Sequence, residues 1–404
     1  MSESGTPAPG AGPLDGVRVL DLSNLMAGPM CGMFLADFGA EVIKVEHPGN
    51  GDGMRRWGSL KDGKGLFFKM VNRNKKTITL DLHHEAAQDI VRRLARDVDV
   101  IIENYRPGTL ERWGIGYEQL SRENPKLIMA RITGYGQDGP YSQRRTLGTI
   151  AEAFSGCVYV SGFEDRSPML PPFGLGDAST AIMTAYGIVM ALYHRDAGNG
   201  AGQVIDSALY DGLFTLLGPH VIDYDQLGII QERGRIAHVA PRNTYQTKDG
   251  KWIVLSGGTG RTFERILATF GASEILEDPR FADNPLRIEN VGPLDEKLRE
   301  VIGGITFDEL TERMKETGAP IGAVMNVADT FEDPQYAHRH NIVSVPDEDF
   351  GTVRMQNAVP HLTGTPGEIR HTGGNRGEHT DEILTRLAGL SAEDIERLRA
   401  EGTV

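Results

Sequence analysis

The chain has 404 residues, which is enough for about two or three domains of ordinary size. It contains 42 Lys and Arg residues against 56 Asp and Glu residues, so its net charge is −14. An acidic total of this kind argues against a general nucleic-acid-binding protein, although it leaves room for a local basic pocket. We therefore expect no nucleic-acid partner.

The two cysteines, Cys31 and Cys157, have no spacing typical of a disulfide framework or a metal site. Such sparse cysteine suits a reducing cytoplasm, and no metal is expected. The first dozen residues are mostly Ser, Gly, Pro and Ala, which predicts a disordered lead-in over residues 1–12 without a signal peptide. No apolar run is expected to reach membrane-spanning length, so no membrane partner is expected either.

Strands and helices alternate through the N-terminal part of the chain. The pattern predicts a strand over Val17–Leu22, a helix that begins near Pro29 and stops at Gly39, and a strand over Glu41–Glu46. A strand–helix–strand unit of about thirty residues implies a parallel pair. Further strands are predicted over residues 77–82, 98–103 and 127–132, with helices over 85–96 and 110–124. This alternation is typical of an α/β fold with a doubly wound sheet.

The second half of the chain changes character. A strand over residues 203–206 and a helix over 208–217 follow the glycine-rich break at 198–202, and an irregular stretch over 226–242 indicates a domain boundary. Strands over 251–256 and 321–325, with helices over 263–270, 293–302 and 307–317, predict a smaller α+β domain. A helical tail over 391–401 ends the chain. The predicted layout is a large domain over 13–225, a small domain over 226–330 and a C-terminal part over 331–404 that returns to the large domain.

The stretch Pro172–Ser179 places one acid, Asp177, after two glycines and before an apolar run. This pattern predicts a tight turn that delivers a carboxylate to the start of a buried helix. One interpretation is an N-cap, because an Asp oxygen accepts free N–H groups of the first turn. The other is a nucleophile. The two roles are compatible, since the helix dipole would keep the carboxylate charged.

Basic and amide side chains gather in loops that follow the predicted strands. The set comprises His47, residues 72–76, Asn104, Arg106, Arg112, Arg144 and Arg145. Each alone is typical of ordinary surface charge, but loops at the carboxyl ends of parallel strands share one edge and suit a phosphorylated ligand. No G-x-G-x-x-G fingerprint accompanies them, so nicotinamide binding is not expected. No G-x-S-x-G elbow accompanies His379, so a hydrolase triad is not expected.

Taken together, several short pieces resemble the family III CoA-transferases, the group of formyl-CoA transferase, carnitine CoA-transferase and the bile-acid-inducible protein. The matching pieces, in chain order, are Val19–Leu22, Ala27–Pro29, Phe38–Glu46, Asn72–Lys75, Glu103–Gly108, Gly134–Gly136, Gly174–Asp177, Gly202–Asp206 and Gly377–Thr380. The resemblance implies a Rossmann-like, doubly wound large domain built from both chain ends, a smaller α+β domain between them, and two subunits interlocked as a homodimer.

The resemblance places the family's catalytic aspartate on Asp177. It implies transfer of CoA between an acyl-CoA and a free carboxylic acid, through an aspartyl anhydride and an aspartyl-CoA thioester. The residues it implies for holding coenzyme A are Met26, Ala27, His47, Leu80, His83, Asn104, Tyr105, Arg106, Arg112 and Arg145. Arg73 and Lys75 are interpreted as structural.

Two departures from formyl-CoA transferase bear on the substrate. That enzyme has glutamine where this chain has Met26, and it has a glycine-rich loop that is missing between Tyr245 and Lys251. An oxalate or formate enzyme is therefore not expected. The apolar pair Leu25 and Met26 favours a larger or less polar acyl group.

Two other functions stay open on the sequence. An α-methylacyl-CoA racemase or epimerase needs bases on two faces of the substrate, but the corresponding stretch Arg145–Glu152 has no histidine. Only Glu152 could substitute as a base. A non-catalytic acyl-CoA-binding protein is the second alternative, although such a protein would not need the Asp177 carboxylate.

Overall fold

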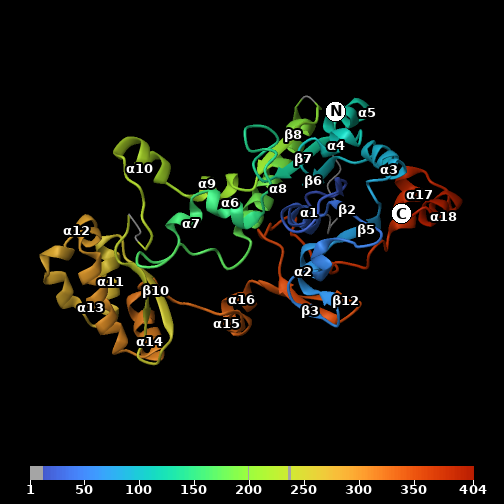
Figure 1. Cartoon of the computed structure of the whole chain (residues 1–404). Helices are drawn as coiled ribbons and strands as arrows, with labels where there is room; N and C mark the ends of the chain where they lie inside the picture. The colour runs from blue at the N-terminus through green and yellow to red at the C-terminus, as the bar shows by residue number, and fades with distance from the viewer. Residues whose placement is uncertain (1–11, 199, 235–237) are drawn as a thin grey trace. The chain divides into compact units, whose positions relative to one another are not determined.

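A computed structural model describes residues 12–198, 200–234 and 238–404 of the chain (Figure 1). Apart from Gly12, the predicted lead-in lies outside the described residues, as do Asn199 of the glycine-rich break and residues 235–237 of the irregular stretch. The chain divides into two compact units. Unit 1 comprises the chain up to Ser161 together with residues 168–228 and 340–404, and unit 2 comprises residues 162–167 and 229–339.

A six-stranded parallel sheet forms the centre of unit 1, with the order β5-β2-β1-β6-β7-β8. Its strands are β1 (Arg18–Asp21), β2 (Glu41–Glu46), β5 (Lys75–Thr79), β6 (Val100–Glu103), β7 (Ile128–Thr133) and β8 (Val204–Ala208). The prediction of an α/β fold with a parallel sheet is confirmed. The strand order reverses between β1 and β6, and open α/β sheets bind ligands at such a switch point, beyond the carboxyl ends of the strands.

Consecutive side chains of the central strands enter two separate apolar cores. Leu20 of β1 lies in the first core and its neighbour Val19 lies in the second. Because successive side chains of a strand point to opposite faces, helices cover both faces of this sheet. The helices over the first core are α3 (Glu85–Ala95), α17 (Thr380–Ala388) and α18 (Ala392–Ala400), and those over the second are α1 (Ala27–Asp37), α6 (Gly148–Phe154) and α8 (Leu175–Ala197).

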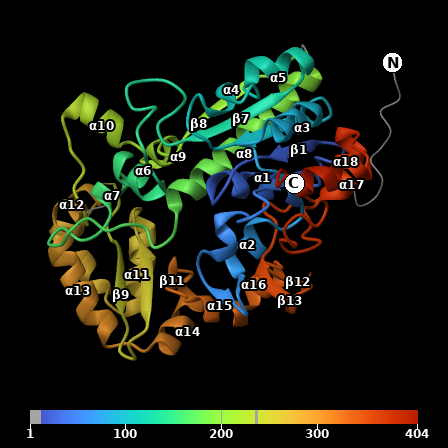
Figure 2. The same cartoon turned by 45° about the vertical axis from the view of Figure 1, so that its right-hand side comes forward.

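The C-terminal segment is part of unit 1. The backbone N–H of His379 donates to the Thr77 carbonyl at 2.9 Å, and that of Asp81 donates to the Thr403 carbonyl at 2.8 Å. The helices α17 and α18 lie beside α3 in both views (Figures 1 and 2). Apolar side chains of both C-terminal helices, such as Leu384 and Leu398, therefore complete the first core.

The helix α8 corrects one expectation. It has 23 residues and is long and apolar enough to cross a membrane by length and composition. The polar residues Ser179 and Thr180 interrupt the apolar run in the sequence, so no membrane-spanning length was expected. In the structure both residues are buried within the helix. Half of the apolar window is buried, and Ala181, Ala185 and Ile188 pack in the second core. This packing is that of a core helix.

Shorter elements complete unit 1. They are η1 (Gly53–Arg56), β3 (Leu60–Lys61), β4 (Lys64–Gly65), α2 (Leu66–Val71), α4 (Thr109–Arg112), α5 (Tyr117–Glu123), α7 (Cys157–Val160), α9 (Asp211–Leu216), α10 (His220–Leu227), β12 (Ile342–Asp347) and β13 (Gly351–Gln356). The strands β12 and β13 form a separate antiparallel pair.

Unit 2 has its own core, which includes Tyr245, Phe263 and Leu298. Its antiparallel sheet consists of β9 (Arg242–Gln246), β10 (Trp252–Ser256) and β11 (Ile321–Ala323). Its helices are α11 (Gly260–Phe270), η2 (Ser273–Glu277), η3 (Pro279–Phe281), α12 (Asn284–Glu289), α13 (Val291–Gly303), α14 (Phe307–Thr317), α15 (Val327–Glu332) and α16 (Pro334–His338).

Candidate active site

Asp177 lies in the first turn of α8, but it is not the N-cap. The helix begins at Leu175, its N-cap is Gly174, and no side chain caps it. Glycine is an acceptable N-cap residue, and it starts the helix three residues before the acid. The N-cap interpretation of Asp177 is therefore wrong, and its carboxylate is available for another role.

Glu152 of α6 is the acidic neighbour of Asp177. Its side chain is 2% exposed, and its Oε1 accepts a hydrogen bond from the Gly176 N–H at 3.1 Å. Burial and the nearby charge of Glu152 raise the pKa of Asp177 to about 6. These two effects outweigh the helix dipole, which alone would lower the pKa of the carboxyl group.

Glycine backbone makes room for the nucleophile candidate. A Cβ atom added at Gly148 would lie 2.0 Å from Oδ2 of Asp177, and one added at Gly174 would lie 2.8 Å from the Met26 sulfur. Real Cβ atoms do not approach other atoms this closely. The carboxylate therefore occupies a position that only glycine at residue 148 permits.

Asp177 and Glu152 line a cavity of about 690 Å³ in unit 1. Met26 and Ala27, at the start of α1, also line it; the resemblance implies both as coenzyme contacts. The lining further includes residues that the sequence analysis did not assign to the site: Asn24, Arg56, Trp57, Leu170 and Phe173. The cavity is thus mainly apolar with a few polar groups, which is the usual character of a small-molecule site.

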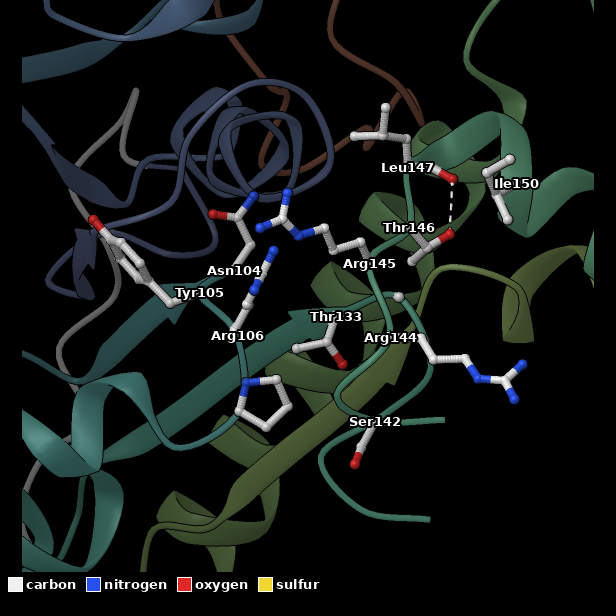
Figure 3. Close-up of a pocket in the computed structure, with 12 residues that line it drawn as sticks. Asn104, Tyr105, Arg106, Thr133, Ser142, Arg144, Arg145, Thr146, Leu147 and Ile150 are labelled. Carbon is white, nitrogen blue, oxygen red and sulfur yellow. Dashed lines mark hydrogen bonds between the residues drawn. The ribbon is translucent and has the colours of Figure 1, made fainter. Parts of the chain in front are cut away.

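A second pocket of about 480 Å³ adjoins this cavity, because both are lined by Asn104, Thr133 and Leu147. It carries Asn104, Tyr105 and Arg106 from the loop after β6, and Arg144 and Arg145 from the chain after β7. In Figure 3 the side chains of Asn104, Arg106 and Arg145 lie close together, whereas that of Arg144 points away from them. The Arg144 guanidinium stacks 3.6 Å from the centre of the Tyr141 ring. Two arginines and an amide are suited to phosphate oxygens.

A third, small hollow of about 50 Å³ collects further predicted residues. His47, Leu80, His83 and Tyr105 line it together with Trp113. The Trp113 ring meets those of His83 and Tyr105 edge to face, with centroids 5.4 Å and 5.2 Å apart. An aromatic wall of this kind can contact a planar base. Tyr105 connects this hollow to the arginine pocket.

Arg112 is the one predicted coenzyme residue that lines none of these three pockets. It is exposed at the end of α4, and its Nη2 donates to Thr109 Oγ1 at 2.9 Å. Arg73 and Lys75, interpreted as structural, are both buried in ion pairs. The Arg73 guanidinium lies 2.6 Å from Asp37 and the Lys75 ammonium 3.0 Å from Asp21.

A family model and known proteins that are similar to the chain are all described as CoA-transferases. The family model described as CoA-transferase family III matches residues 14–380. A succinyl-CoA–D-citramalate CoA-transferase from Chloroflexus aurantiacus is 42% identical over 97% of this chain and 98% of that protein. A succinyl-CoA:glutarate CoA-transferase from Mus musculus is 32% identical over 97% of this chain and 90% of that protein.

Solved structures lead to the same group. A CaiB/BaiF family protein from Brucella suis has a TM-score of 0.82 and 32% identity, over 93% of this chain and 100% of that one. A Mycobacterium tuberculosis protein, solved as an aspartate-to-alanine variant, has a TM-score of 0.82 and 30% identity over 93% of this chain and 99% of that one.

Proposed function

Because this chain belongs to CoA-transferase family III, we propose that it moves CoA from an acyl-CoA donor to a free carboxylic acid through covalent intermediates on Asp177. The observation that carries the proposal is the position of Asp177. Its partly buried carboxylate lines a cavity that adjoins a pocket with three arginines. A nucleophile and a site for phosphates are thus next to each other.

The proposed reaction exchanges thioester and anhydride bonds without using water. The Asp177 carboxylate attacks the donor thioester carbonyl, which forms a mixed anhydride and releases CoA thiolate. The thiolate then attacks the aspartyl carbonyl, which leaves an aspartyl-CoA thioester and the free donor acid. The acceptor carboxylate attacks this thioester, and the returning thiolate cleaves the new anhydride on its acceptor side. Asp177 is regenerated, and the product is the acceptor's CoA ester.

The raised pKa of Asp177 suits this role. A carboxylate with a pKa of about 6 is a better nucleophile than an ordinary Asp, yet it remains mostly ionised at neutral pH. Glu152 contributes to the shift and also occupies the Gly176 N–H. That N–H is therefore not free to stabilise an oxyanion, and other backbone donors near Asp177 must do so.

For coenzyme A we propose three contact regions, each supported by one of the pockets. Met26 and Ala27 would hold the thioester end, and Asn104, Arg106 and Arg145 the phosphates. His47, Leu80, His83 and Tyr105 would contact the adenosine end. Arg112 stays a prediction from the resemblance alone.

We propose succinyl-CoA as the donor. Relatives with 42%, 38% and 32% identity are named as succinyl-CoA transferases, with D-citramalate, L-malate and glutarate as the second acid. The acceptor names of these three relatives differ, whereas their donor name is the same; a relative of 34% identity is instead named as an acetyl-CoA:oxalate CoA-transferase. The proposal concerns the donor for that reason.

We also propose that the protein is a homodimer. The side of α8 that faces away from the core exposes Ile182, Met183, Tyr186, Val189, Met190 and Tyr193. Their spacing forms one continuous apolar stripe along the helix, and large apolar patches of this kind mark association surfaces. Two relatives of 38% and 37% identity are named as beta and alpha subunits of one transferase. Each of these subunits matches 97% of this chain, so one family chain associates with another in that enzyme. We therefore propose that a second copy of this chain covers the apolar stripe of α8.

Chemical trapping tests the covalent mechanism. The protein is incubated with succinyl-CoA, treated with hydroxylamine, and the modified residue is mapped by mass spectrometry. We expect a hydroxamate on Asp177, because hydroxylamine cleaves both aspartyl anhydrides and aspartyl thioesters. The Asp177→Asn variant is the control, and it should give no adduct and no CoA transfer.

One outcome would replace the proposal by its main rival. An unmodified Asp177 combined with exchange of the substrate α-proton for solvent deuterium would indicate a racemase or epimerase. Glu152 and Asp177 line the same cavity, so two carboxyl groups are available for such proton transfer. A protein that binds acyl-CoA with neither adduct nor exchange would be a binding protein only.

A further inference from the structure

The cavity around Asp177 is unbalanced in charge. Its lining contains the acids Asp177 and Glu152, and among the described residues that line it Arg56 is the only lysine or arginine. The other arginines of the site, Arg106, Arg144 and Arg145, line the adjoining pocket. Any second negative charge on an acyl group bound in this cavity therefore has one cation available to it.

Arg56 is free to take such a charge. It is exposed, and its Nη1 donates to the Asn50 carbonyl at 2.6 Å. In the described part of the chain no carboxylate pairs with it. A guanidinium has five N–H donors, so one backbone bond leaves a side of the planar group for a bidentate contact.

The neighbouring Arg55 shows the contrast. It donates to both carboxylate oxygens of Glu46 at 2.7 Å, and its guanidinium lies 3.8 Å from the centre of the Phe68 ring. These contacts give Arg55 a structural role. They also anchor η1, the short helix that carries Arg56.

A second contact holds the start of η1. The Asp52 carboxylate accepts the Met54 N–H at 2.9 Å and lies 3.1 Å from the buried Lys44 ammonium. Arg56 therefore projects from an element that is fixed at both ends. A fixed origin is what a specificity contact requires, because a mobile one would lose more entropy on binding.

We infer that Arg56 binds the distal carboxylate of a dicarboxylic acyl group while Asp177 attacks its thioester. The inference rests on the proposed function and extends it to a substrate class and a residue. Leu25, Met26 and Trp57 line the same cavity and suit the methylene groups between the two ends. Leu25 and Met26, which favoured a larger or less polar acyl group, would thus contact the methylene groups in the middle of the substrate. Arg56 would bind the carboxylate at its far end. Without Arg56, a distal carboxylate would face two acids with no partner, which is unfavourable.

The first half of the reaction tests this inference without knowledge of the acceptor. Aspartyl-CoA formation and release of the free acid are measured in single turnovers with succinyl-CoA and with butyryl-CoA, which has a methyl group in place of the carboxylate. For Arg56→Met we expect the ratio of kcat/KM for succinyl-CoA to that for butyryl-CoA to fall about tenfold or more. Arg56→Lys should recover part of the ratio, because it restores the charge without the planar fork. Arg122→Met, which removes an exposed arginine from α5, should leave the ratio unchanged.

The alternative results separate this inference from the proposed function. Equal losses for both donors in Arg56→Met, or no loss for either, would overturn the role of Arg56. A wild-type protein that uses butyryl-CoA as well as succinyl-CoA would overturn the dicarboxylate class but keep the transferase. Failure of the wild type to form aspartyl-CoA from either donor would overturn the proposed function itself.

Discussion

Two residues of α6, Gly148 and Glu152, control the surroundings of Asp177. Gly148 leaves room for the Asp177 side chain, because a Cβ at position 148 would lie 2.0 Å from Oδ2 of Asp177. Glu152 places a negative charge near Asp177, and this charge raises the pKa of Asp177 beyond the effect of burial. The helix α6 thus acts as the support that positions and tunes the proposed nucleophile.

Replacing Gly148 by alanine should displace the Asp177 carboxylate. We expect kcat for CoA transfer to fall by about two orders of magnitude, since small displacements of reacting groups have effects of this size. The measurement is steady-state CoA transfer together with the thermal midpoint. Gly303→Ala in α13, where an added Cβ meets nothing within 4 Å, should leave both unchanged. A Gly148→Ala enzyme with normal kcat would show that the carboxylate can rotate away without loss.

The rate of aspartyl-CoA formation should rise with pH through about 6, because only ionised Asp177 attacks the thioester. Glu152→Gln removes a negative charge and keeps an oxygen that can accept the Gly176 N–H. The pKa of Asp177 should fall, so the acid limb of the pH–rate profile should move to lower pH. Single-turnover rates between about pH 4.5 and 8 measure this. If the acid limb of the Glu152→Gln profile stays in place or moves to higher pH, the charge of Glu152 does not raise the pKa of Asp177.

The sequence pointed to Asp177 and to proposed coenzyme residues that, except for Arg112, line the three pockets, because short motifs and loops after strands are local signals. It did not identify Gly148, Arg56 or the contact of Glu152 with Gly176. Glu152 and Gly176 are 24 positions apart, and only the packing of α6 against α8 brings them together. The raised pKa of Asp177 could not be predicted for the same reason, since burial is a property of the folded chain.

Among the elements, α8 shows best what a pattern can and cannot predict. One side of the helix packs in the second core and the other exposes large apolar side chains. A helix that is apolar on both sides has no clear period, so its full length was not predicted, although Asp177 does lie in its first turn as expected. The strands β1, β2, β6 and β7 were predicted well because each is a short, buried run between turns. The strand β5 begins before its predicted start at Thr77, and β8 is only partly buried. The hairpin of β3 and β4 was missed, because these two-residue strands are largely exposed.

Truncation of a side chain on α17 tests how far the C-terminal helices stabilise unit 1. Leu384 is fully buried in the first core, so Leu384→Ala should lower the free energy of unfolding by about 2–5 kcal/mol. Urea denaturation monitored by circular dichroism measures the loss. Thr385→Ala, at an exposed position on the same helix, is the control and should change stability little. Equal midpoints for the two variants would mean that α17 is dispensable for unit 1.

At the scale of the whole molecule, the exposed stripe of α8 predicts the state of assembly. Light scattering coupled to size-exclusion chromatography should give twice the mass of one chain. Tyr186→Glu combined with Met190→Glu places two charges on the stripe and should abolish the dimer, because buried charges without partners are unfavourable. Thr385→Glu, at an exposed position of α17, should keep the dimer. A wild-type monomer, or a double variant that still dimerises, would contradict the proposed surface.

The division of unit 1 into separate stretches of chain has a consequence for biosynthesis. The core of unit 2 draws on residues between Tyr245 and Ile321, whereas the first core of unit 1 also requires Leu398 and Val404. A chain leaves the ribosome from its N-terminus, and units fold as their residues emerge. Unit 2 can therefore finish its core while one face of the earlier-made sheet still lacks α17 and α18. Until α17 and α18 have been made, that face of the sheet exposes apolar side chains of the first core, and a chain that lacks these helices cannot cover it.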